Sequence, residues 1–114
     1  MTRKEGKIMR QLEDIQQTCA RAEIIRIMRT VTEYKQHELS STFGVSESFI
    51  TQMEKARKKV NDEILEKYLV FFGVDRKSFD EVEKRAIEII FEKKEEKLKL
   101  VLIVVEMMLN SKQD

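Results

Sequence analysis

Residues 34–60 decide the fold, and they read YKQHELSSTFGVSESFITQMEKARKKV. The spacing of their apolar side chains predicts two short helices, over residues 35–42 and 47–55, with a tight turn around Gly44 between them. A glycine supplies the positive φ that such a turn requires, and Ser46 is a typical N-cap for the second helix. This pattern predicts a helix-turn-helix, a motif whose second helix can enter the major groove of DNA.

The composition predicts an all-α protein with one small domain and helical extensions. The 114 residues include no proline and only three glycines, so few positions interrupt a helix, and 38% of the residues are charged. The formal net charge is only +1. Any affinity for DNA therefore depends on local charge, and residues 35–59 hold five cations against three carboxylates.

Several other classes of protein are not expected. We find no Ser/His/Asp set, glycine-rich phosphate loop or metal-ligand spacing, so we expect no enzyme, cofactor, metal site or small-molecule substrate. The single Cys19 permits no internal disulfide, and we expect it to be a small buried residue, with a redox sensor as the alternative. No signal peptide is visible, and the apolar run 98–109 is too short for a membrane span, which needs about 20 residues.

The remaining segments also have helical patterns. The N-terminal part has a heptad-like apolar stripe, and no breaker follows it, so one continuous or bent helix over about residues 6–33 is possible. Residues 61–72 form the next predicted helix, and residues 78–111 the last. The charged patch at residues 92–97 is either a solvated helical face or a break between two helices. The N-terminal apolar stripe consists of Ile8, Leu12, Ile15, Cys19 and Ala22.

The stretch from about residue 23 to residue 79 resembles the helix-turn-helix domain of the Xre/Cro and phage-repressor family. The resemblance implies a five-helix, lambda-repressor-like domain at residues 22–79, with helical extensions at residues 1–21 and 80–114. It also implies a bacterial or phage-encoded, cytoplasmic and nucleoid-associated repressor that binds double-stranded DNA. The matching residues are Gln36, Glu38, Leu39, Phe43, Gly44, Val45, Ser46, Ile50, Glu54, Leu69, Phe72, Gly73 and Val74.

The resemblance also assigns roles to individual residues. Contacts to base edges are expected on the exposed face of the second helix, at Glu47, Ser48 and Gln52, with Phe49 and Thr51 flanking them. Contacts to phosphates are expected at Lys55, Arg57, Lys58 and Lys59. Gln36 is expected to hold a phosphate and to brace the second helix. For Glu47, a solvated surface position remains an equal alternative. Glu54 is expected to pair with Arg29 and so to fix the helix geometry.

The chain departs from the family pattern after the second helix. Ala56 stands where the family often has glycine, and no proline occurs near Val60. We therefore expect the loop that follows the second helix to be more helical than in the family.

The C-terminal helix is predicted to build a homodimer. It is apolar nearly all round, and such a helix is buried on most sides. A partner subunit is the expected cover, with the N-terminal stripe as a further contact, although the tail could instead fold back over its own domain or form a strand. A dimer would place two recognition helices about 34–36 Å apart, on a near-palindromic site. The predicted dimerisation stripe consists of Leu98, Val101, Leu102, Val105 and Leu109.

Two functions therefore remain open on sequence grounds. The first is a sequence-specific DNA-binding transcriptional regulator, a repressor that acts as a homodimer. The second is a helix-turn-helix module used mainly for protein contacts, as in an antitoxin or an adaptor.

Overall fold

The computed structural model describes residues 3–92 and 97–111, and within them the chain forms six helices and no strand. This confirms the all-α prediction. The N-terminal helix is continuous, so the pattern of residues 6–33 belongs to one helix. The helices are α1 (Arg3–Val31), α2 (Gln36–Phe43), α3 (Glu47–Glu54), α4 (Asp62–Phe72), α5 (Arg76–Phe91) and α6 (Lys97–Ser111).

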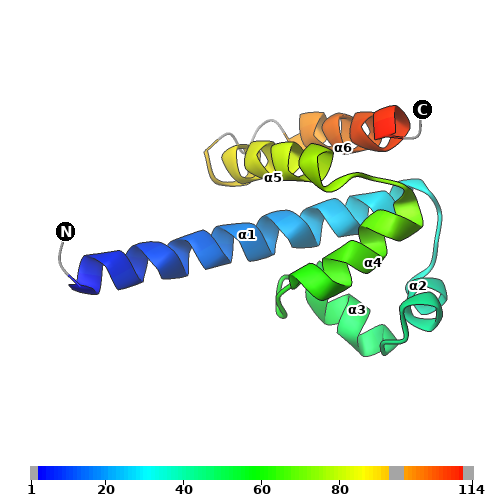
Figure 1. The fold of residues 1–114 in the computed structure, drawn as a ribbon, viewed down its shortest axis with the longest axis horizontal. Coiled ribbons are helices and arrows are strands. Elements are labelled where there is room, and N and C mark those ends of the chain that lie inside the picture. Colours follow the sequence, from blue (N-terminus) through cyan, green and yellow to red (C-terminus); the bar gives the residue numbers. More distant parts are fainter. Residues whose placement is uncertain (1–2, 93–96, 112–114) are drawn as a thin grey trace.

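The helices are arranged on two sides of α1. In Figure 1, α5 and α6 lie side by side along one side of α1, and α2, α3 and α4 lie on the other. α5 and α6 run in opposite directions, so the C-terminal region is a pair of packed helices. α5 ends at Phe91 and α6 begins at Lys97, and most of the charged patch, residues 93–96, lies outside the described residues.

Local capping explains where most of the helices begin and end. α2 and α4 are followed by Gly44 and Gly73, whose φ values of 70° and 68° lie in the left-handed region that glycine adopts without strain. The side chains of Ser46, Asn61 and Asp75 each accept a hydrogen bond from the backbone N–H three residues further on, at the starts of α3, α4 and α5.

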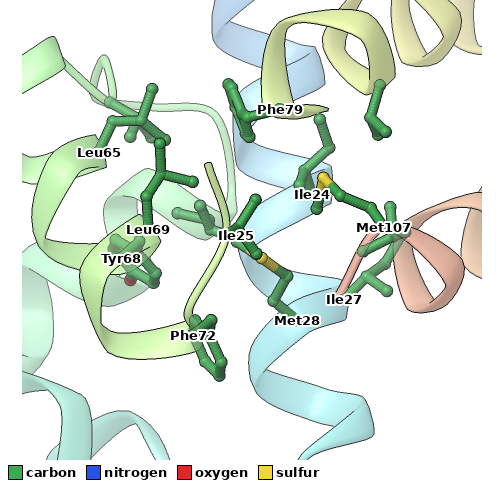
Figure 2. Close-up of a cluster of buried hydrophobic side chains, with 14 of the residues drawn as sticks. Ile24, Ile25, Ile27, Met28, Leu65, Tyr68, Leu69, Phe72, Phe79 and Met107 are labelled. Carbon is green, nitrogen blue, oxygen red and sulfur yellow. The ribbon is translucent and has the colours of Figure 1, made fainter. Parts of the chain in front are cut away.

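The hydrophobic core is built around the C-terminal half of α1 (Figure 2). This half is buried on both sides, because α4 covers one side and α5 with α6 the other. α5 and α6 therefore share one hydrophobic cluster with the helices around the turn. Among the side chains of this cluster are Ile24, Ile25, Ile27 and Met28 of α1, Leu65, Tyr68, Leu69 and Phe72 of α4, Phe79 of α5 and Met107 of α6.

The N-terminal half of α1 is different, because its apolar residues are exposed. Ile8, Leu12 and Ile15 are each more than half exposed, and Cys19 is half-buried, not buried as expected. Within the described ranges, no helix combines the length and the apolar composition that a membrane-crossing segment requires.

Candidate nucleic-acid interface

The turn between α2 and α3 is fixed by a small buried core. Leu39 and Phe43 of α2 and Ile50 and Met53 of α3 are all buried. A Cβ built on Gly44 would meet nothing within 4 Å, so glycine is required there for its positive φ and not for lack of space. The two helices are therefore held at one angle by packing on their inner sides.

The outer side of α3 is polar and accessible. Glu47 and Ser48, in its first turn, are exposed, and Gln52, one turn further on, is half-exposed. Ile50, Met53 and Glu54 lie on the buried side of the same helix. α3 therefore presents a short polar face of the size and composition that contacts to base edges require.

Gln36 and Thr51 bind each other across the two helices. The hydroxyl of Thr51 donates to Oε1 of Gln36 at 2.9 Å, and Nε2 of Gln36 donates to Oε1 of Glu54 at 3.2 Å. Both ends of the Gln36 amide are thus engaged inside the protein. Gln36 therefore braces α3 as expected from the sequence, and Thr51, expected to flank the base contacts, is its partner in that brace.

Arg29 and Glu54 form the ion pair expected from the sequence. Nε and Nη2 of Arg29 donate to the two carboxylate oxygens of Glu54 at 2.6 and 2.8 Å, and Nη1 donates to the backbone carbonyl of Tyr34 at 3.0 Å. The hydrogen bond to Glu54 is the main cause that raises the pKa of Arg29. A paired geometry of this kind fixes α3 against α1.

Phe49 packs inward and does not join the exposed polar face. Its ring is half-buried against the core, and the ammonium of Lys58 lies 5.3 Å from the ring centroid. This is a distance at which a cation is attracted to an aromatic face. Phe49 therefore connects α3 to the following loop.

The segment between α3 and α4, residues 55–61, is a loop and not a helix, which corrects the expectation of a more helical connection. Ala56 adopts a positive φ of 58°. The backbone N–H groups of Arg57 and Lys58 both donate to the carbonyl of Gln52, at 2.8 and 3.3 Å. The left-handed residue turns the chain back, so the helix stops although neither glycine nor proline is present. The exposed cations of this stretch, which we call the basic loop (residues 55–59), are Lys55, Arg57, Lys58 and Lys59.

Arg21 holds the far end of the basic loop, and sequence reasoning missed it. Its side chain is 5% exposed, and its guanidinium donates to Glu83 at 2.7 Å, to the carbonyl of Val60 at 2.7 Å and to Asp62 at 3.1 Å. The hydrogen bond that Arg21 donates to Asp62 is the main cause that lowers the pKa of Asp62. The signal in the sequence was helical spacing, because Ile24, Ile25 and Met28 follow Arg21 by three, four and seven residues, on the same side of α1, and all three are buried.

The C-terminal helix is covered on one side only. Leu100, Val104 and Met107 are buried against the rest of the chain, as expected for a tail folded back over its own domain. On the predicted dimerisation stripe, Leu102 and Leu109 are 70% and 60% exposed. Val101 and Val105 are half-buried, and the side chain of Leu98 lies outside the described part of the structure.

No family model, curated protein or solved structure matches the chain. In the part of the chain that the structure describes, no group of three or more His, Cys, Asp or Glu side chains is placed to hold a metal ion. The function is therefore inferred from the geometry of the chain itself.

Proposed function

We propose that the chain is a sequence-specific DNA-binding regulator of the repressor type, with a lambda-repressor-like helix-turn-helix domain, that acts as a homodimer. The observation that carries the proposal is the combination of α3 and the basic loop. α3 is held from its inner side while its outer side is polar, and four exposed cations follow it directly. This is the division between base contacts and phosphate contacts that a DNA-reading surface requires.

The residues divide into three roles on this proposal. Ser48 and Gln52 bind base edges, and a glutamine can form two hydrogen bonds with adenine. Glu47 can accept from cytosine N4. The basic loop binds phosphates, while Gln36 and Thr51 hold α3 in place and make no base contact of their own.

Binding to DNA selected from a random pool tests this assignment. Gln52→Ala is expected to weaken binding to the selected DNA by about 1–3 kcal/mol and to leave binding to unselected DNA nearly unchanged. Lys58→Ala is expected to weaken both kinds of DNA and to reduce the salt slope by about one unit. Lys84→Ala, which removes an exposed cation of α5, serves as the matched control. Absence of DNA binding at low salt would contradict the proposal.

The homodimer is supported by the open face of α6. Leu102 and Leu109 are large, apolar and exposed on a helix whose other side is already covered. Removing α6 would uncover the core, because Leu100 and Val104 belong to it. Leu102→Glu together with Leu109→Glu is therefore the cleaner test, and light scattering should report a monomer. A dimer that survives both substitutions would place the interface elsewhere.

The alternative function, a module for protein contacts, is favoured by one observation. Glu47 exposes a carboxylate at the start of α3, where a phosphate backbone would repel it. Glu47→Gln separates the two functions. It should change base preference or strengthen binding if α3 reads DNA, and have no effect on DNA if α3 contacts a protein.

A further inference from the structure

The N-terminal part of α1, residues 3–18, exposes a row of large apolar side chains, and we call this segment the arm. Ile8, Met9, Leu12 and Ile15 are each 48–54% exposed. Spacings of three and four residues place them on one side of the helix. In Figure 1, the N-terminal end of α1 extends beyond the end of α5. A helical segment of about this length is marginal in water without a packed neighbour, so a partner on this row would stabilise it.

The charges of the arm are divided along its length. Residues 3–10 carry four cations and one carboxylate, a net charge of +3, whereas residues 11–18 carry two carboxylates and no cation, a net charge of −2. Two such arms attract each other when they run in opposite directions, because each basic half then faces an acidic half. In the same direction, like charges would face each other. The charged residues in question are Arg3, Lys4, Glu5, Lys7, Arg10, Glu13 and Asp14.

We propose that the arm is a self-association surface, on which the arm of a second copy of this chain packs in the antiparallel direction. The two arms cross near Leu12, so that Ile8 of each copy meets Ile15 of the other. Arg10 of each copy then lies on the same side as Glu13 and Asp14 of the other. Asp14 already lies 3.4 Å from Lys59, but both side chains are exposed, and an exposed pair of this kind holds the carboxylate only weakly.

The contact is separate from the open face of α6 and does not depend on DNA binding. The arm has 16 residues, fewer than the roughly 20–30 residues that each side of a stable interface contributes. We therefore expect weak pairing of arms. If α6 forms a dimer as well, the arms join dimers into larger assemblies, because the two surfaces lie on different parts of the fold (Figure 1).

Sedimentation equilibrium of the full chain, at tens to hundreds of micromolar, tests the apolar row. Replacing Ile8, Leu12 and Ile15 together by serine should weaken one step of association about tenfold or more. Heat unfolding of the domain should change little, because these side chains lie outside the core. Unchanged association would overturn the proposal. The α6 substitutions, measured in parallel, report separately on the dimer of the proposed function.

Charge reversal tests the direction of the arms. Lys7→Glu with Arg10→Glu, or Glu13→Lys with Asp14→Lys, should each weaken association, and all four substitutions together should restore it. Association that strengthens with Lys7→Glu and Arg10→Glu would overturn the antiparallel arrangement. As a further control, the variant with serine at positions 8, 12 and 15 is tested for binding to DNA and to phosphatidylglycerol vesicles. If the serine substitutions alter binding to DNA or vesicles but not self-association, the arm serves that ligand and the proposal fails.

Discussion

Ala56→Gly is expected to stabilise the protein. Ala56 is the residue at which the chain turns back after α3, and its φ of 58° lies in the left-handed region. For a residue with a Cβ atom, this conformation is unfavourable by about 1–2 kcal/mol, because the Cβ crowds the following carbonyl oxygen. Glycine has no Cβ, so the substitution removes this strain from the folded state.

The gain is partly offset by the unfolded state. Glycine has more conformational freedom there than alanine, which returns about 0.5–1 kcal/mol to the unfolded chain. The net increase in the free energy of unfolding should therefore be about 0.5–1 kcal/mol. For a chain of this size that corresponds to a rise in Tm of about 2–5 °C. DNA affinity should stay constant, because the loop already has the conformation that glycine prefers.

Urea unfolding followed by circular dichroism measures the change, and two controls bracket it. Lys55→Gly, at a φ of −92°, introduces the same flexibility without relieving strain and should destabilise by about 0.5–1 kcal/mol. Gly44→Ala imposes a Cβ at a φ of 70° with free space around it, so it should destabilise through the backbone alone. If Ala56→Gly lowers stability as Lys55→Gly does, residue 56 is not held in the left-handed region.

Three further predictions concern buried polar groups, and urea unfolding checks each of them. Glu54→Gln should cost about 1.5–3 kcal/mol, because it removes the charge that Arg29 is bonded to; a loss below about 0.5 kcal/mol, the value of one weak hydrogen bond, would show that the pair adds nothing. Arg21→Met should cost about 3–5 kcal/mol, since it leaves the carbonyl of Val60 and a carboxylate without their donor, and a neutral outcome would refute the clamp. Tyr68→Phe should be neutral or stabilising, because the buried hydroxyl has no hydrogen-bond partner among the described residues. Burial raises the pKa of Tyr68, so the unfolded chain releases this proton first and wild-type stability should fall as pH rises above about 10, more steeply than in Tyr68→Phe.

The parts of the fold that could be predicted from the sequence are those set by local chemistry. Gly44 ends α2 and Ser46 begins α3 through interactions within a few residues, so their pattern is visible in the sequence. The helical spacing of apolar side chains that predicts the second short helix also places Ile50 and Met53 on one side of it, and both are buried. The pairing of Arg29 with Glu54 came from the family resemblance, because the two residues are 25 positions apart and no local pattern connects them.

The features that were missed depend on contacts between distant segments. From the sequence, a cation such as Arg21 is expected to be exposed. Its burial depends on the positions of α4 and α5, which supply its partners Asp62 and Glu83. Thr51 reads as a surface residue of α3 until Gln36 is placed against its hydroxyl. The last helix is apolar nearly all round in sequence, and packing against α1 and α5 decides which of its sides is buried. The one signal at Ala56 was that the resembled family often has glycine there, but an alanine does not itself favour the left-handed conformation, which the turn around it imposes.

Three polar side chains of α1 contact the segment from the end of α3 to the start of α4, namely Asp14, Arg21 and Arg29. Arg29 holds Glu54 at the near end of the basic loop, and Arg21 holds the carbonyl of Val60 at its far end. These two arginines are eight residues apart, which is about 12 Å along a helix. α1 thus sets the distance between the face proposed to read bases and the loop proposed to bind phosphates. The same helix carries the arm and packs against α6, so a partner bound at either surface would act on the helix that positions the face proposed to read bases.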